Sequence, residues 1–260
     1  EPIASPPELV EKYVAQGADG EGEALYYANV ENMDRAVGDL TAALDRLGVA
    51  DDTIVYFTSD NGPETLNRYG GAWRSWGSPG ELRGMKLWIY EAGYRVPGIV
   101  RWPNQIDAGQ TIAEPVCALD LLPTMCELAD VELPTDRTYD GASLVSFLEG
   151  GEEVERAKPL YWHYHNALSD VRVAIRDGQW KLTATLAGDA PSSLGAGFKE
   201  EQMNVYMQAE LDTFELYDLE ADPSETNDLS EEHPAVLARM RAQIETMFHE
   251  VRDEGTNWWE

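Results

Sequence analysis

An apolar run of residues ends directly in side chains that could hold a metal ion. The segment 53–58 is rich in β-branched and aromatic residues and predicts a strand, and Ser59, Asp60 and Asn61 follow it without a spacer. A carboxylate and an amide carbonyl are hard oxygen donors, which suit Ca²⁺ or Mg²⁺ better than zinc or copper. Because Asp-Asn-Gly is also a common turn sequence, these residues alone favour an ordinary turn over a metal site.

The segment 61–103 is positively charged, although the protein as a whole is strongly acidic. The 260-residue chain has 48 acidic and 19 basic residues and a formal net charge of −29. A cationic loop beside a cation site would attract an anionic substrate, whereas the alternative is that its arginines neutralise neighbouring acids at the surface. The basic residues of the segment are Arg68, Arg74, Arg83, Lys86, Arg95 and Arg101, and its acidic residues are Glu64, Glu81 and Glu91.

Charge and composition exclude several classes of partner. So acidic a chain is not expected to bind nucleic acid or anionic lipid, and no apolar run approaches the roughly 20 residues that a membrane span needs. The opening sequence EPIASPPELVEKY has no basic segment followed by an apolar one, so no signal peptide is predicted in this chain. Cys117 and Cys126 lie within one predicted helical stretch and imply neither a disulfide framework nor a thiolate metal site.

The order of predicted elements indicates an α/β fold with a largely parallel sheet in residues 1–150. A stripe of apolar residues predicts a helix over 24–47 that stops at Gly48, and Pro123 must lie in the first turn of a later helix or kink it. In a parallel sheet Asp60 and Asn61 would lie at the carboxyl end of a strand, where ligands bind. The other expected elements are a long connection over 62–94, a strand over 95–101 and a helix over 119–129.

Residues 151–260 predict a second, smaller domain, an antiparallel sheet with a closing helix over 235–251. Asp177-Gly178 predicts a hairpin turn, and residues 188–197 predict a flexible loop insertion. His163 and His165 alternate along a strand and could bind a metal, but no third ligand is visible at a useful spacing, so packing against aromatic rings is favoured. The expected strands are 159–165, 171–176, 179–186 and 214–219.

Five separated blocks of the sequence resemble the C-terminal half of a type I sulfatase, in the arylsulfatase and N-acetylgalactosamine-6-sulfatase branch. The blocks are TSDNGPE, SWGSPGELRGMKLWIYEAGYRVPGIVRWP, LDLLPTMCELA with DGASL, WKL, and ELYDLEADPSETNDL. The resemblance covers about residues 1–250 and weakens over 187–213. It implies part of an alkaline-phosphatase-like α/β sulfatase fold, with a smaller C-terminal subdomain of antiparallel sheet and helix.

The resemblance also implies roles for individual residues. In the family, the Asp-Asn of the first block binds an active-site Ca²⁺, which corresponds to Asp60 and Asn61, and the lysine of the LRGxK block, here Lys86, reaches a sulfate oxygen. Ala92 departs from the usual Glu-Gly-Gly turn, which puts the local backbone in question. The implied substrate is a sulfated small molecule or glycan, and the implied location is periplasmic or secreted.

The nucleophile of the family is absent from this chain. Sulfatases use a formylglycine made from the first residue of a Cys/Ser-x-Pro-x-Arg motif, and the sequences after Cys117 and Cys126 do not match it. We therefore expect a fragment that contributes Ca²⁺-binding and sulfate-binding residues to sulfate-ester hydrolysis. Its partner would be the missing N-terminal half of the same enzyme, and the chain alone would be inactive.

Two alternatives stay open at the level of the sequence. One is a phosphoryl-transfer hydrolase of the same alkaline-phosphatase-like fold, which would hold a second metal through extra Asp and His ligands. Asn61 and the lack of an adjacent histidine favour the sulfatase. The other is a non-catalytic, Ca²⁺-dependent carbohydrate-binding chain, which would leave Lys86 with little purpose.

Overall fold

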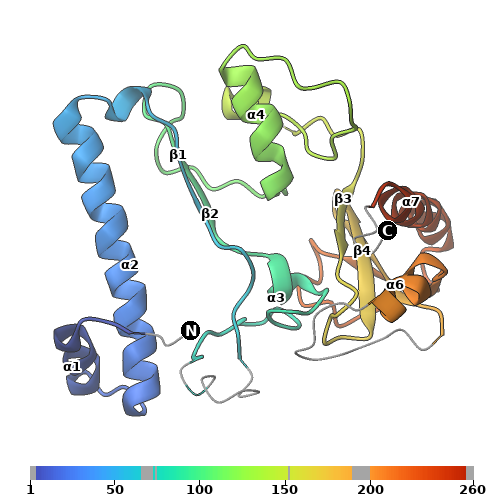
Figure 1. Ribbon diagram of the computed structural model, residues 1–260, viewed down its shortest axis with the longest axis horizontal. Coiled ribbons are helices and arrows are strands. Elements are labelled where there is room, and N and C mark those ends of the chain that lie inside the picture. The colour runs from blue at the N-terminus through green and yellow to red at the C-terminus, as the bar shows by residue number, and fades with distance from the viewer. Residues whose placement is uncertain (1–3, 66–72, 74, 152, 189–199, 256–260) are drawn as a thin grey trace. The chain divides into compact units, whose positions relative to one another are not determined.

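The computed structural model describes residues 4–65, 73, 75–151, 153–188 and 200–255. The chain divides into two compact units, one of Glu1–Gly80 with Ala92–Gly109 and the other of Glu81–Glu91 with Gln110–Glu260 (Figure 1). These units are not the predicted segments 1–150 and 151–260, because residues 110–150 group with the C-terminal sheet. The domain boundary at residue 150 stays a prediction.

The first unit begins with two helices that pack against each other, α1 (Pro7–Ala15) and α2 (Gly20–Leu47). The end of α2 at Gly48 is as predicted, and its cause is visible. Gly48 has a φ of +70°, and the next N–H, of Val49, donates to the Leu44 carbonyl at 3.2 Å. This left-handed cap is the arrangement for which glycine is favoured after a helix.

The apolar stripe predicted along α2 is exposed over much of its length. The exposed fractions are 44% for Val30, 49% for Met33, 54% for Leu40 and 74% for Leu47. Side chains of this size are usually buried when they lie in a continuous row on a helix. Within the described residues, α2 thus presents a long apolar face to solvent.

The two strands of the first unit pair antiparallel, so the prediction of a largely parallel sheet is wrong for this pair. Residues of β1 (Val55–Thr58) pair with β2 (Gly98–Arg101) in the register Val55 to Arg101 and Thr58 to Gly98. A parallel pair needs a crossover, usually a full helix. The longest helix in the described part of the connection is the four-residue α3 (Glu91–Tyr94), and the short 3-10 turn η1 (Ala50–Asp52) precedes β1.

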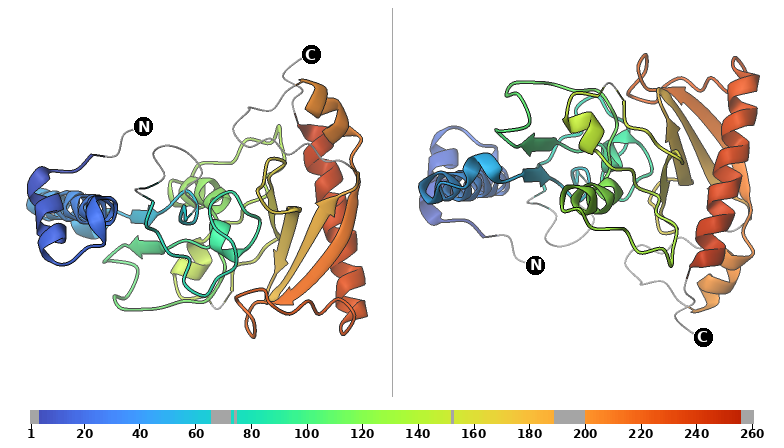
Figure 2. Two further views of the ribbon diagram at one scale, coloured as in Figure 1. Left: turned by 90° about the horizontal axis from the view of Figure 1, so that it is seen from below. Right: turned by 90° about the horizontal axis from the view of Figure 1, so that it is seen from above.

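The second unit is built on a four-stranded antiparallel sheet covered on one face by a long helix, as predicted (Figure 2). Side chains of three of the four strands and of the helix form its core, among them Val173, Leu182, Leu216, Ile244 and Phe248, each with no exposed surface. The strands in sheet order are β3 (Leu160–His163), β4 (Val171–Asp177), β5 (Trp180–Leu186) and β6 (Leu211–Asp218), and the helix is α7 (Pro234–Glu254).

The predicted hairpin between β4 and β5 exists, but its turn lies one residue later. Asp177 pairs with Trp180, so the two turn residues are Gly178 and Gln179, and Gly178 has a φ of +59°. Gly178 is still a turn residue, but it occupies the first of the two turn positions, where a two-residue hairpin needs a positive φ. The predicted loop insertion falls largely on residues 189–199, which lie outside the described residues.

The remaining helices of the second unit are short. They are η3 (Ala118–Asp120), α4 (Leu121–Leu128), α5 (Val145–Leu148) and α6 (Glu200–Met207), and Pro123 lies in the first turn of α4 as predicted.

The buried Asp120 carboxylate accepts two hydrogen bonds from Arg156, both at 2.7 Å, and one from the Ala142 N–H at 2.9 Å. Both cysteines are free thiols. None of the described helices has the length and apolarity to cross a bilayer.

Candidate functional site

The turn that carries Asp60 and Asn61 directly follows β1 and is closed by its own side chains. The Ser59 hydroxyl donates to the Asn61 carbonyl at 3.0 Å, and the Asn61 amide nitrogen donates to the Gly62 carbonyl at 2.8 Å. These bonds use the donor groups of the turn and leave its acceptors, the Asp60 carboxylate and the Asn61 Oδ1, available. Asp60 is exposed and Asn61 is half-buried.

Gly62 fixes this turn against α3. Its N–H donates to the Gly93 carbonyl at 2.9 Å, and a Cβ at position 62 would lie 1.7 Å from the Ala92 carbonyl oxygen. Only glycine permits so close a backbone approach. Ala92 itself is buried in α3 and is not among the residues with positive φ, so the helix accommodates the departure from the family pattern.

Asp60 and Asn61 have the donor chemistry for part of a hard-cation site. Neither the Asp60 carboxylate nor the Asn61 Oδ1 has a partner among the described residues. Ca²⁺ takes six to eight oxygen ligands, so two side chains cannot complete its coordination. No group of three or more His, Cys, Asp or Glu side chains that could hold a metal occurs in the described parts of the chain. The two residues therefore fit part of a Ca²⁺ site, which would need further ligands.

Lys86 lies at the second position of a tight turn in the second unit. The Trp88 N–H donates to the Met85 carbonyl at 3.0 Å, and Leu87 has a φ of +71°, a left-handed conformation that is uncommon for leucine. The Leu87 carbonyl accepts a hydrogen bond from the Leu168 N–H at 2.8 Å. The Lys86 ammonium makes no hydrogen bond or ion pair with the described residues, so it is available to an anion.

Asp60 and Asn61 belong to the first unit and Lys86 to the second. The structure thus brings the two predicted metal ligands together in one turn and places the predicted sulfate-binding lysine in another. All three roles stay predictions.

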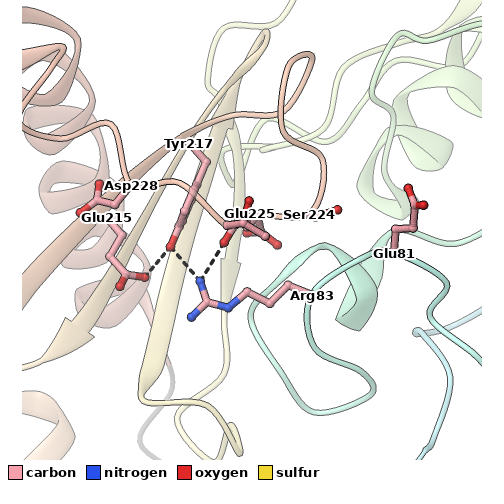
Figure 3. Close-up of a pocket in the computed structure, with 8 residues that line it drawn as sticks. Glu81, Arg83, Glu215, Tyr217, Ser224, Glu225 and Asp228 are labelled. Atoms are coloured by element: carbon pink, nitrogen blue, oxygen red, sulfur yellow. Dashed lines mark hydrogen bonds between the residues drawn. The ribbon is translucent and has the colours of Figure 1, made fainter.

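Two of the arginines in the basic segment are structural. One nitrogen of Arg83 donates to the Tyr217 hydroxyl at 2.9 Å and to the Glu225 carbonyl at 3.0 Å, in a pocket that Glu215 also lines (Figure 3). Arg101 lies 3.6 Å from Asp45. Arg101 therefore neutralises an acid at the surface, as the alternative expected, whereas Arg83 bonds to a hydroxyl and a backbone carbonyl. Arg68 and Arg74 lie outside the described residues.

A buried ionic cluster contains Glu91, close to Lys86 in the sequence, and was not predicted. Lys181 lies 2.5 Å from the Glu225 carboxylate and 3.3 Å from that of Glu91, and the exposed fractions of Lys181, Glu225 and Glu91 are 0%, 0% and 1%. Burial raises the pKa of Glu225, and the Lys181 charge opposes that rise. The only hint of the cluster in the sequence is that Lys181 stands between Trp180 and Leu182 in a predicted strand. The same pattern is equally typical of a lysine that faces solvent.

The prediction that His163 and His165 share one strand is wrong, because β3 ends at His163 and His165 lies in the turn that follows; the contacts of His163 indicate packing, as favoured. His163 stacks on Tyr206 with ring centroids 5.1 Å apart and meets the edge of Phe248 at 5.7 Å. Burial, assisted by His165, lowers the pKa of His163 to about 4. The ring is therefore neutral at pH 7 and behaves as part of the aromatic core around α7.

Models of two protein families match the chain. A model described as Sulfatase matches residues 2–131, and one described as N-sulphoglucosamine sulphohydrolase, C-terminal, matches residues 84–188. The chain belongs to the sulfatase family. The resemblance of the five sequence blocks to this family is confirmed.

Curated relatives and solved structures agree with this assignment. The chain is 37% identical to the steryl-sulfatase of Mus musculus over 80% of its own length, and 31% identical to the N-acetylgalactosamine-6-O-sulfatase of Bacteroides thetaiotaomicron over 83%. These matches cover 34% and 40% of the two relatives. The crystal structure of Ps i-CgsB in complex with k-i-k-neocarrahexaose matches with a TM-score of 0.70 and 26% identity, over 95% of this sulfatase chain and 47% of that one.

The fold class is thereby confirmed as part of the alkaline-phosphatase-like sulfatase fold. The sulfatase chain spans less than half the length of each of these three relatives.

Proposed function

We propose that this chain is the C-terminal part of a sulfatase that hydrolyses sulfate esters of sugars or aryl compounds, and that Lys86 binds the sulfate group. Family membership together with the unpartnered ammonium of Lys86 carries the proposal. In a protein of net charge −29, a lysine with no acidic partner among the described residues is unusual, because carboxylates are abundant. A compact point charge suits a tetrahedral anion, since three N–H donors can rotate toward its oxygens.

Asp60 and Asn61 would supply two oxygen ligands to a Ca²⁺ ion. The rigid contact between Gly62 and α3 would hold both side chains at the end of β1 without using their acceptor oxygens. When bound, the ion would stabilise negative charge on the sulfuryl oxygens. Lys86 would neutralise part of the same charge with its ammonium group, which is the contribution that fixed charges make to such reactions.

We also propose that an N-terminal half of the same enzyme covers the exposed apolar surfaces of this chain and supplies the formylglycine. The exposed stripe on α2 supports this, and so does a second set of exposed apolar side chains around α4. The second set consists of Ile112, Leu119, Leu122, Met125 and Val131, each more than a third exposed. Matched relatives also extend well beyond the region that this chain covers. A periplasmic or secreted location, as the resemblance implies, is part of the same proposal.

The proposed function is tested by comparing 4-nitrophenyl sulfate with 4-nitrophenyl phosphate as substrates of the complete enzyme. We expect turnover of the sulfate and none of it by the 260-residue chain alone, since no residue in it can become the formylglycine. Preference for the phosphate would instead support a phosphoryl hydrolase. Sulfate turnover by the 260-residue chain would contradict the proposed division of the site.

The isolated chain should bind Ca²⁺ weakly. Affinity for Ca²⁺ follows the number and charge of the ligands, and Asp60 and Asn61 are two ligands with one charge. Titration calorimetry should show no binding at micromolar Ca²⁺, and the little seen at millimolar Ca²⁺ should be lost in Asp60→Ala. Binding that survives Asp60→Ala, or submicromolar affinity, would show that the ligand set is a different one.

A further inference from the structure

The residues around Lys86 have no regular secondary structure of their own. Between Glu81 and α3 the backbone forms turns and bends, and Leu87 holds a left-handed conformation. Such a segment keeps one shape only if other parts of the molecule hold it. The contacts that do so come from the second unit, to which Glu81–Glu91 belongs.

The segment is held on both sides of Lys86 and at the turn itself. On the N-terminal side, Arg83 donates to Tyr217 and to the Glu225 carbonyl, and its guanidinium lies 3.9 Å from the centre of the Tyr90 ring. On the C-terminal side, the Glu91 N–H donates to the Glu225 carboxylate at 2.6 Å. At the turn itself the Leu168 N–H donates to the Leu87 carbonyl at 2.8 Å, and directly after the turn the Ile89 N–H donates to the Ser169 hydroxyl at 3.3 Å.

Glu225 is the residue that both sides share. Its backbone carbonyl accepts a hydrogen bond from Arg83, and its carboxylate accepts one from the Glu91 N–H and forms an ion pair with Lys181. The Lys181 ammonium also contacts the Glu91 carboxylate. Glu225 has a φ of +53° in a turn braced by Asp222, whose carbonyl accepts the Glu225 N–H at 3.2 Å and whose carboxylate accepts the Thr226 N–H at 2.7 Å. Glu225 thus connects the C-terminal sheet to the two flanks of the lysine turn.

We propose that Glu225, with Arg83 and Lys181, is a positioning residue for Lys86. This inference rests on the proposed function, because it assigns to the C-terminal sheet the task of holding the sulfate-binding ammonium in place. A displacement of about 1 Å at a reacting group can cost up to 10²-fold in rate, even when the altered residue is remote. The Glu225 side chain touches neither Lys86 nor, by this proposal, the substrate.

The test uses Glu225→Gln in the complete enzyme, which keeps the shape of the side chain and removes its charge. We expect kcat/KM for 4-nitrophenyl sulfate to fall by on the order of 10-fold in the wild-type background and to change little in the Lys86→Ala background. Amide hydrogen exchange of peptides within 82–91 should accelerate, because the Glu91 N–H loses its charged acceptor. Arg83→Lys, a milder change, should shift both measurements in the same direction.

Asp120→Asn is the matched control. It makes the same carboxylate-to-amide change at a fully buried ionic contact of the same unit, and the Asp120 side chain bonds to Arg156, Cys117 and Ala142, outside 81–91. Exchange in 82–91 and kcat/KM should both stay near wild type.

Unchanged exchange in Glu225→Gln, or an equal loss of rate with and without Lys86, would overturn the positioning role. If the complete enzyme hydrolyses no sulfate ester, the proposed function fails, and the exchange measurement alone decides whether Glu225 holds the lysine turn.

Discussion

Replacing Lys86 by alanine in the complete enzyme should lower the turnover of 4-nitrophenyl sulfate by about 10²- to 10³-fold, which is the usual cost of removing one preorganised charge from a reaction centre. The Lys86 ammonium has no acidic partner among the described residues, so its removal leaves none of their charged groups unpaired. The melting temperature should therefore stay near that of the wild type. Turnover and melting temperature are measured on the same preparation.

Two further variants define the role of Lys86 more sharply. Lys86→Arg should restore little activity, because a planar fork does not replace a compact point charge beside a tetrahedral anion. Lys158→Ala is the control for removing a lysine from the second unit, since Lys158 bonds to Asp140 and Glu250 at the surface. Near-wild-type turnover in a folded Lys86→Ala enzyme would show that the sulfate is bound by other residues.

Local patterns predicted the elements because each depends on neighbouring residues. The apolar period of α2, the glycine after it and the turn at Gly178 all depend on backbone conformations that a few adjacent residues determine. The antiparallel pairing of β1 with β2 was missed, because strand direction depends on how the long connection between them folds. Alternation of helix and strand is only an indirect guide to that direction.

The buried charges next to the predicted sulfate-binding lysine were not predicted. The roles of Asp60, Asn61 and Lys86 came from the resemblance of their sequence blocks to sulfatases, since the residues alone favoured an ordinary turn, and these roles stay predictions. Glu91, Lys181 and Glu225 are spread over more than 130 positions, and each is unremarkable where it stands. The residues next to each of these side chains do not indicate that all three will be buried in contact with one another, because burial is a property of the folded chain.

The second large effect is expected at Lys181. In Lys181→Met a side chain of similar length is kept, but the buried Glu91 and Glu225 carboxylates lose the ammonium that lies between them. Breaking a buried ionic contact by removing one partner typically costs about 3–5 kcal/mol, because the remaining charges are desolvated without compensation. Arg176, 3.8 Å from the Glu91 carboxylate, offsets part of that cost. Urea unfolding at pH 7 gives the change in the free energy of unfolding.

The pH dependence of this loss separates lost charge pairing from lost packing. Without Lys181 the pKa of Glu225 should rise further above that of the unfolded chain, so the destabilisation is full above the folded-state pKa and shrinks as the pH falls through it and the carboxyl becomes neutral. Adding Glu225→Gln to Lys181→Met should recover stability at pH 7 for the same reason. Lys158→Met at the surface should cost less than about 1 kcal/mol at any pH. A loss at Lys181→Met that is equal from pH 5 to pH 8 and unrelieved by Glu225→Gln would mean that the lysine stem, and not its charge, holds the cluster together.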